Sequence, residues 1–365
     1  VVTQKTPRNA RTRFWYGLLL VTVLLLQAVT PIPTSAQGIG MVNQALAKMS
    51  PEEKVGQLFL VSFDGTDFST TSEIYQLITN YHVGGVLLRA DRNNFKSELT
   101  TDSAKQLITA LQETHSSAVV GGDPSNDPLV VPLFIGISQE GGGYPYDQIL
   151  AGLTPIPNQM ALGATWDPSL ARQSGEIMGR ELSELGFNFY YGLSLDVLTL
   201  TDPAKNPDLS TRLFGSDPYW VGQFGKAFTA GIKTGSGSKV AVIAKRFPGG
   251  GAADRPASLD IPTIRKSLEE LQTYELQPFF QVMGNAGSPE DTVDGIVVGH
   301  IRYQGFQGNI RATTKPISFD QQALAQLLDM PDIQTWRDAG GLVVSDDLGT
   351  AAVKNFYDPT GQTFN

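Results

Sequence analysis

The feature that most limits the fold of this 365-residue chain is a regular alternation of short apolar runs with longer amphipathic stretches. Short apolar runs suit buried strands, and the stretches between them have the 3.6-residue period of surface helices. Repeated strand–helix units build a parallel sheet, because each helix carries the chain back to the edge where the next strand begins. The predicted strands cover residues 58–63, 85–89, 133–138, 187–192, 240–245, 295–300 and 341–346. The predicted helices between and after them include residues 72–81, 104–115, 170–185, 219–232, 264–282 and 320–328.

Seven such units predict an α/β fold of the (β/α)₈ barrel type whose last βα unit is missing from this chain. A closed barrel has no sheet edges, whereas seven strands leave the first and the seventh unpaired. We therefore expect residues 37–365 to form one barrel domain that is incomplete at its C-terminal side. A doubly wound open sheet is the alternative, but no G-x-G-x-x-G motif opens the first helix.

Residues 1–36 have the pattern of an export signal. Basic residues between Lys5 and Arg13 precede a largely apolar run over 14–29, and small residues follow at Thr34 and Ala36. The run is shorter than the roughly 20 residues that span a bilayer, and the small residues suit a signal-peptidase cut before Gln37. An uncleaved N-terminal membrane anchor is the alternative. Both interpretations predict that the folded part lies outside the cytoplasm, secreted or attached to the cell envelope.

Charge and composition exclude several classes of function. The chain has 27 Lys and Arg against 36 Asp and Glu, a net charge of −9, so we expect no nucleic-acid partner. Cysteine is absent, which excludes disulfides, thiolate metal sites and a cysteine nucleophile. Only three histidines are present, at 82, 115 and 300, and we expect neither a metal site nor a cofactor. A membrane is expected as a partner only through the N-terminal segment.

Polar side chains stand where the predicted strands end, on the face of a barrel that carries its active site. Acidic and basic groups that converge on one face suit a substrate rich in hydroxyl groups. The strand-end residues are Ser138, Gln139, Glu140, Asp196, Lys245, Arg246, His300, Asp346 and Asp347.

Short motifs in a fixed order run from about Met49 to the end of the chain. They are EEKVGQL at 52–58, VGGV at 83–86, QEGG at 139–142, LDV at 195–197, RLFGSDP at 212–218, KRFPGGG at 245–251 and SDDL at 345–348. In order and spacing they resemble glycoside hydrolase family 3, specifically its single-domain β-N-acetylhexosaminidase branch. The resemblance implies that residues 37–365 are the N-terminal catalytic barrel domain of that family.

The resemblance assigns the nucleophile to the aspartate that follows serine in the last motif, which is Asp346. A retaining glycosidase needs a carboxylate at that place to form a covalent glycosyl-enzyme. Taken alone, Asp346 or Asp347 is better explained as a cap of the helix after the seventh strand. The other motifs favour the nucleophile.

Sugar-binding positions of the family fall on Arg212 and Lys245, whose side chains can donate to adjacent hydroxyl oxygens. Glu140 and Asp196 align with the family's Gln-Glu-Gly and Leu-Asp-Val runs, and structural hydrogen bonding at the strand ends explains them at least as well. His300 matches a family histidine that lines the site, and a buried, hydrogen-bonded histidine is the alternative.

Two kinds of departure from the family pattern affect the site. Ser138 stands where the family usually has aspartate, and Arg246 where it has histidine, so the contacts to the sugar are changed. Both positions are still expected to bind substrate. The family's Asp-x-His acid/base pair, on the loop after the fifth strand, falls here on Pro256 and Ser258, and neither can donate the proton.

An alkyl leaving group still needs a general acid, which contributes about 10²- to 10⁴-fold to the rate. Asp254 is the nearest carboxyl group in that loop, although pairing with Arg255 would lower its pKa. The acid can also come from a segment beyond this chain or from a partner chain.

The resemblance predicts a retaining exo-glycosidase that removes terminal β-linked N-acetylglucosamine from cell-wall-like or chitin-like saccharides, and the N-terminal segment predicts that this enzyme is exported. Its substrate would be an oligosaccharide. A β-glucosidase or β-xylosidase of the same family is the enzymatic alternative. A carbohydrate-binding pseudoenzyme that has lost the acid/base loop is the non-enzymatic one.

Overall fold

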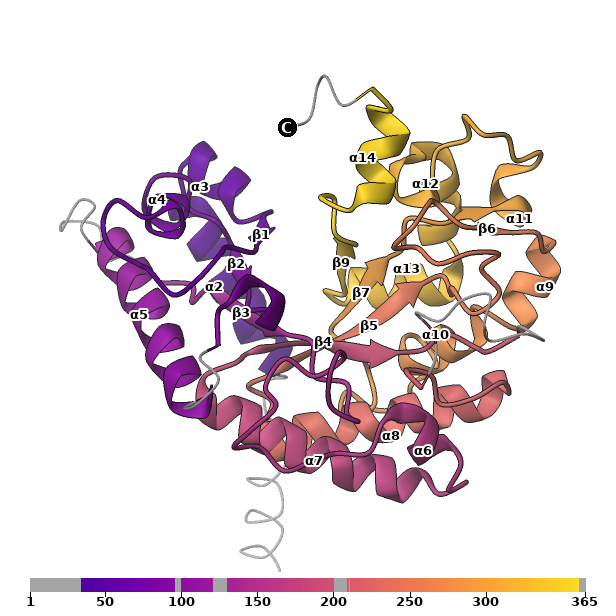
Figure 1. The fold of residues 1–365 in the computed structure, drawn as a ribbon, viewed down its shortest axis with the longest axis horizontal. Coiled ribbons are helices and arrows are strands. Elements are labelled where there is room, and N and C mark those ends of the chain that lie inside the picture. The colour runs from indigo at the N-terminus through magenta and orange to yellow at the C-terminus, as the bar shows by residue number, and fades with distance from the viewer. Residues whose placement is uncertain (1–33, 96–99, 121–129, 200–208, 210, 361–365) are drawn as a thin grey trace, which may run out of the picture.

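The computed structural model describes residues 34–95, 100–120, 130–199, 209 and 211–360. Its main element is a seven-stranded parallel sheet whose strand order follows the chain, β1-β2-β3-β4-β5-β7-β9. Figure 1 shows this sheet curled, with helices on its outer side. The predicted α/β class is confirmed, and the order lacks the reversal that marks a doubly wound sheet. The strands are β1 (Leu60–Val61), β2 (Gly85–Leu87), β3 (Phe134–Ile137), β4 (Phe189–Ser194), β5 (Ala241–Phe247), β7 (Gly295–Val298) and β9 (Leu342–Ser345).

Helices precede and connect these strands. The first short helix begins at a capping box, in which Ser50 Oγ accepts from Glu53 N and Glu53 Oε2 accepts from Ser50 N. The helices up to β5 are α2 (Thr34–Lys48), α3 (Pro51–Gly56), α4 (Glu73–Thr79), α5 (Thr100–Val120), α6 (Gln159–Gly163), α7 (Pro168–Leu185) and α8 (Pro218–Ser236). Those after β5 are α9 (Leu268–Thr273), α10 (Gln277–Val282), α11 (Gln304–Gln307), α12 (Gln321–Leu328), α13 (Pro331–Asp338) and α14 (Ala351–Tyr357). Within the described ranges, 3₁₀ turns cover Ala90–Arg92 and Ile317–Phe319.

The largest difference from the predicted elements is the helix expected over 264–282, which is two helices, α9 and α10. Pro278 lies in the first turn of α10, and its ring would clash with the carbonyl of Tyr274 in a continuous helix. Residues at the start of that range instead form β6 (Thr263–Ile264), which pairs with β8 (Arg302–Tyr303) in a separate two-stranded sheet. Helix α13 was not predicted, because only Ile333 and Trp336 are buried along it.

The N-terminal segment is described only from Thr34. Helix α2 includes Gln37, before which the signal-peptidase cut is predicted. The rest of the predicted export signal lies outside the described residues. Among the helices that the structure describes, none combines the length and apolar character needed to cross a membrane.

Alternate residues of the strands face two different apolar layers. Phe189 and Ile243 belong to a small cluster inside the curl, together with Val297, whereas Tyr190 and Val242 belong to the large core that the helices cover. This two-residue alternation is the normal consequence of strand geometry. The inward-facing rows therefore continue along each strand toward its C-terminal end.

Helices α7 and α8 pack unusually closely, side by side beneath β4 and β5 (Figure 1). Glycines permit this approach: a Cβ atom on Gly175 or Gly179 would overlap backbone oxygens of α8, and one on Gly231 or Gly235 would overlap backbone oxygens of α7. No side chain therefore separates the two helices along this line.

The first and last strands in the order, β1 and β9, lie at opposite ends of the curled sheet (Figure 1). Within the described ranges each pairs with one neighbour only. Apolar side chains are exposed beside both edges: Leu58 has 81% of its surface exposed, Phe59 53% and Leu342 38%. The seven strands of the main sheet, as far as the structure describes them, thus form an open, barrel-like sheet.

Candidate active site

A cavity of about 480 Å³ lies at the C-terminal ends of the parallel strands. Five of its polar lining residues follow from the alternation of the strands, because each lies two positions after an inward-facing residue of its own strand. In this way Leu87 leads to Arg89, Gly136 to Ser138, Phe189 to Tyr191, Ile243 to Lys245 and Val344 to Asp346. Strand geometry thus brings side chains from five separate βα units to one place.

Glu140 is the centre of the hydrogen bonding in this cavity. Its Oε1 accepts from Lys245 Nζ at 2.6 Å, from Arg212 Nη2 at 2.7 Å and from Ser138 Oγ at 2.8 Å, and its Oε2 accepts from Arg212 Nε at 2.5 Å. Burial alone would raise the pKa of Glu140, but the charges of Lys245 and Arg212 lower it to about 2. Glu140 is therefore an ionised anchor and has no proton to give near neutral pH.

Lys245 uses its three N–H groups within the protein. Besides Glu140, its ammonium donates to Tyr191 O at 3.0 Å and to Ser138 Oγ at 3.2 Å. Burial lowers the pKa of Lys245 to about 8, even though the Glu140 charge acts in the opposite direction. A sugar hydroxyl would have to replace one of these three acceptors, and the bond to Ser138 is the longest of them.

Asp346 lies at the mouth of the same cavity, where its two carboxylate oxygens have different surroundings. Oδ1 accepts from Asp347 N at 2.9 Å and from the hydroxyl of Tyr191 at 3.0 Å, and Oδ2 lies 3.7 Å from Arg246 Nε. Burial acts to raise the pKa of Asp346, but the Arg246 charge, the Asp347 N–H, the His300 ring and the Tyr191 hydroxyl together hold it below its ordinary value. The carboxylate is ionised and faces the space where a ligand would bind.

The predicted role of Asp346 or Asp347 as a helix cap does not hold for the helix after β9. Thr350 is the N-cap of α14, with its hydroxyl accepting from Val353 N. Asp347 Oδ1 accepts instead from Gly349 N at 2.8 Å within the turn.

Two predicted residues, Asp196 and His300, are buried beside the cavity and do not line it. Asp196 Oδ1 accepts from Gly250 N at 2.5 Å and from Arg246 N at 3.4 Å, so this carboxylate holds the turn after β5. His300 Nε2 lies 3.1 Å from Asp347 O and its Nδ1 lies 2.7 Å from Ser318 Oγ. Because a carbonyl can only accept, Nε2 carries a proton. Asp196 and His300 thus make the structural hydrogen bonds that are the alternative to their predicted roles in substrate binding.

Asp254, the predicted acid/base, is not among the residues that line the cavity. Its Oδ1 accepts from Thr263 N at 2.8 Å, and Arg255 donates to both of its carboxylate oxygens at 3.2 Å. Its carboxylate is thus tied to the strand β6 and to the neighbouring guanidinium.

Several residues that line the cavity were not predicted from the sequence, among them Tyr191, Arg89 and Asp91. Arg89 donates from Nε and Nη2 to the two oxygens of Asp91, at 2.8 and 2.7 Å. Tyr191 belongs to an apolar stretch that reads as plain core. The alternation of strand residues was the signal that could have found Tyr191 and Arg89, since it places both on the inward face.

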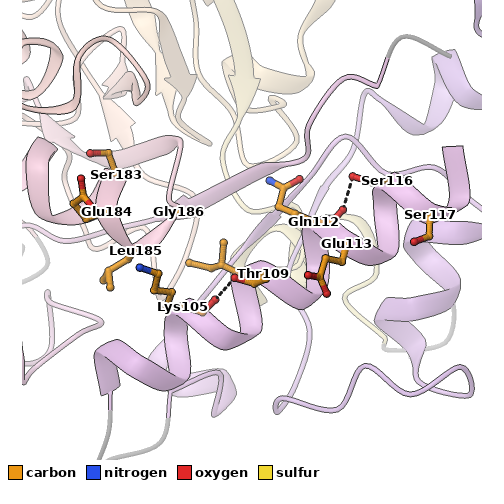
Figure 2. A pocket seen from close by; sticks show the side chains of 11 residues that line it. Lys105, Thr109, Gln112, Glu113, Ser116, Ser117, Ser183, Glu184, Leu185 and Gly186 are labelled. Carbon is orange, nitrogen blue, oxygen red and sulfur yellow. Dashed lines mark hydrogen bonds between the residues drawn. The ribbon is translucent and has the colours of Figure 1, made fainter. Parts of the chain in front are cut away.

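A second cavity of about 480 Å³ lies between α5 and the end of α7. Figure 2 shows its side chains, in which Thr109 and Ser116 bond to carbonyl groups of their own helix. It gathers no paired charges comparable to those around Glu140. Among the described residues, no group of His, Asp and Glu side chains is arranged to hold a metal ion.

The comparisons with known proteins agree on one family. The model for the glycosyl hydrolase family 3 N-terminal domain matches residues 50–363. A β-N-acetylglucosaminidase/β-glucosidase of Cellulomonas fimi is 28% identical over 323 residues, which cover 88% of this chain and 50% of that protein. The β-hexosaminidase LpqI of Mycobacterium bovis is 27% identical over 329 residues, which cover 90% of this chain and 72% of that protein.

The fold leads to the same group. The structure of a glycoside hydrolase family 3 β-N-acetylglucosaminidase from Paenibacillus sp. str. FPU-7 matches with a TM-score of 0.70 and 28% identity, over 85% of this chain and 51% of that one. The chain thus spans about half the length of the Cellulomonas and Paenibacillus proteins. With the family model matched over most of its length, the chain belongs to glycosyl hydrolase family 3 and contains the N-terminal domain of that family.

Proposed function

We propose that this protein is a retaining exo-glycosidase whose nucleophile is Asp346. The observation that carries the proposal is the state of this carboxylate: it is held ionised at the mouth of a cavity, with Oδ2 turned toward the side chain of Arg246. An ionised carboxylate in that position can attack an anomeric carbon and form a glycosyl-aspartate.

The proposed substrate is an oligosaccharide with a terminal β-linked N-acetylglucosamine, of the cell-wall or chitin type. The names of the Cellulomonas, Mycobacterium and Paenibacillus relatives support an N-acetylhexosamine. The cavity supports a small polar ligand, because Arg246 lines it and its guanidinium has no hydrogen bond to the described side chains. The Arg246 side chain is 19% exposed, and its guanidinium can donate to two adjacent sugar oxygens.

The protonation of the leaving group is the step that the described residues support least. Of the carboxyl groups that line the cavity, only Asp147 has a pKa above its ordinary value, caused by burial. Its two oxygens accept from Gly141 N and Gly143 N, both at 2.7 Å, so it is occupied in the turn. A test of the nucleophile should therefore use a leaving group that departs without a proton.

The test is hydrolysis of a panel of dinitrophenyl β-glycosides by the full chain and by Asp346→Asn. We expect turnover of the N-acetylglucosaminide, a loss of at least about 10³-fold in Asp346→Asn, and a glycosyl adduct on Asp346 visible by peptide mass spectrometry. Asp347→Asn is the matched control, because its side chain is adjacent and an amide oxygen can keep the bond to Gly349 N.

The outcomes separate the alternatives. Preference for the glucoside or xyloside would move the assignment to a β-glucosidase or β-xylosidase. Saccharide binding without turnover of any glycoside would identify a carbohydrate-binding pseudoenzyme, which is favoured by the tied carboxylates of Asp147 and Asp254. Equal losses in Asp346→Asn and Asp347→Asn would contradict the assignment of the nucleophile.

We also propose that one more βα unit closes the sheet between β1 and β9. Support comes from the single neighbour of each of these strands among the described residues, and from the apolar side chains exposed beside them. Amide hydrogen exchange tests this proposal. Slow exchange of the edge amides of β1 and β9 would support a strand that pairs with both, and fast exchange would contradict it.

A further proposal concerns residues 1–36, which we infer to be an export signal or an N-terminal anchor. The basic residues, the apolar run over 14–29 and the small residues before Gln37 support it. A fusion of residues 1–40 to a reporter enzyme that is active only outside the cytoplasm would show activity if the segment directs export. N-terminal sequencing of the exported product would separate cleavage from anchoring.

A further inference from the structure

Tyr191 lies between two charged groups of the cavity, the ammonium of Lys245 and the carboxylate of Asp346. It faces inward from the middle of β4, and Lys245 Nζ lies 4.9 Å from the centre of its ring. The same ammonium donates to the carbonyl oxygen of Tyr191, at 3.0 Å. At the far end of the ring, the hydroxyl donates to Asp346 Oδ1 at 3.0 Å. The side chain of Tyr191 thus contacts both the buried ammonium of Lys245 and the carboxylate of Asp346.

This contact makes the two oxygens of Asp346 unequal. Oδ1 accepts two hydrogen bonds, from Tyr191 and from Asp347 N. Among the described residues, the one ion-pair partner of Oδ2 is the Arg246 guanidinium, and 3.7 Å is close enough for charge attraction but too long for a hydrogen bond. The lone pairs of Oδ2 are therefore available, whereas those of Oδ1 are engaged.

We propose that Tyr191 is a positioning residue that holds Oδ1 and so presents Oδ2 as the attacking atom. This inference rests on the proposed function of Asp346 as a nucleophile. In the step concerned, an Oδ2 lone pair forms the bond to the anomeric carbon. The bond from that carbon to the leaving-group oxygen breaks, and its electron pair departs with a phenolate when the substrate is a dinitrophenyl glycoside.

The same contact serves both halves of the reaction. Once Oδ2 is esterified, Oδ1 becomes the carbonyl oxygen of the glycosyl ester and can still accept from the Tyr191 hydroxyl. When water later attacks the anomeric carbon, its oxygen forms the new bond, its surplus proton passes to the solvent, and the electron pair of the broken bond returns to the carboxylate. A donor at Oδ1 stabilises that returning charge.

The test compares Tyr191→Phe with the wild type in the hydrolysis of a dinitrophenyl N-acetylglucosaminide. Phenylalanine keeps the ring, and with it the packing against Lys245, but it lacks the hydroxyl. We expect kcat/KM to fall about 10- to 100-fold, the usual effect of losing a hydrogen bond to a charged group. Inhibition by free N-acetylglucosamine should stay within about twofold of the wild type, since the hydroxyl is assigned to the carboxylate and not to the sugar.

The pH dependence of kcat/KM distinguishes the proposed role of Tyr191 from a purely structural one, because loss of a structural contact would not move the acid limb. The charged and titratable groups that face Asp346 are Arg246 from β5, His300 after β7, Tyr191 from β4 and the neighbouring Asp347. Of these, the variant changes only Tyr191, whose hydrogen bond favours the charged carboxylate. The acid limb of kcat/KM should therefore move to higher pH in Tyr191→Phe.

Tyr190→Phe is the matched control. Tyr190 is the adjacent residue, faces the helix-covered core and donates from its buried hydroxyl to Gln139 O at 2.7 Å. Its variant loses a hydroxyl of the same kind without touching Asp346, so its acid limb should stay in place. An unchanged acid limb and unchanged kcat/KM in Tyr191→Phe, with Asp346→Asn inactive, would overturn the role of Tyr191 alone. Full activity of Asp346→Asn would overturn the proposed function itself.

Discussion

The ammonium nitrogen of Lys245 lies 2.6 Å from a carboxylate oxygen of Glu140, and the two side chains have only 3% and 2% of their surface exposed. Arg212 reaches the same carboxylate with two nitrogens. One buried negative charge therefore joins three segments that are distant in sequence: the ends of β3 and β5 and the connection between β4 and α8. Two predictions follow from the burial of this charge.

Replacing Glu140 with glutamine should destabilise the protein strongly. An amide of the same shape leaves the ammonium of Lys245 and the guanidinium of Arg212 buried without a negative partner, which typically costs about 3–5 kcal/mol. Urea unfolding followed by circular dichroism measures the change in the free energy of unfolding. Glu181→Gln is a suitable control, since Glu181 bonds to Thr154 at an exposed site. A loss below about 1 kcal/mol in Glu140→Gln would contradict the prediction.

Stability should fall in acid as Glu140 takes up a proton. Its folded-state pKa of about 2 lies below the ordinary value of 4.5, so the folded state binds fewer protons than the unfolded chain between these two values. The contribution is complete above pH 4.5 and is lost as the pH falls toward 2, and it is on the order of 3 kcal/mol. Unfolding curves at pH 2.5 to 6 measure the slope, which should be smaller in Glu140→Gln. Identical slopes in the two proteins would show that other carboxylates dominate.

Asp254→Asn should leave the hydrolysis of glycosides nearly unchanged, for good and poor leaving groups alike. The carboxylate lies outside the cavity lining and is bonded to Thr263 N and Arg255, so it is not available to protonate a leaving oxygen. A general acid shows itself by a loss of about 10²- to 10⁴-fold that is largest for alkyl and smallest for dinitrophenyl glycosides. Steady-state rates over such a series provide the measurement. A loss that grows with leaving-group pKa would restore Asp254 as the acid.

Gly231→Ala should destabilise the protein by about 1–3 kcal/mol, because overpacking outweighs the gain in helix propensity. The added Cβ would overlap the carbonyl oxygen of Arg172 in α7, which as backbone cannot move aside. Gly40→Ala is the control, since Gly40 is also helical and has open space where the Cβ would be placed. Thermal unfolding of both variants gives the comparison. A transition temperature of Gly231→Ala equal to that of the wild type would contradict the close packing of α7 and α8.

The order of the strands could be predicted from the sequence because each strand is a local apolar run followed by an amphipathic helix. The ends of helices and strands depend on tertiary contacts, and their predicted positions were less accurate. Tyr274 ends α9 although its neighbours have helical periodicity, since Pro278 prevents the helix from continuing. The strand predicted over 58–63 pairs only at Leu60 and Val61, beside an edge that has no second neighbour among the described residues.

The candidate site was predicted in part. Ser138, Glu140, Lys245 and Arg246 line one cavity with Asp346, because residues at the ends of parallel strands must converge. The contact between Tyr191 and Asp346 joins residues 155 positions apart, and no local pattern contains it. Asp254 is close to Lys245 along the chain, but the turn after β5 directs its carboxylate to β6.

The glycine contacts between α7 and α8 have a mechanical consequence for the cavity. These helices lead directly into β4 and β5, which carry Tyr191 and Lys245. Because backbone touches backbone along the helix pair, neither helix can slide or roll inward without compressing main-chain atoms, which are far stiffer than side chains. The spacing of the two side chains is thus supported from the opposite side of the sheet, by glycines that lie outside the cavity lining.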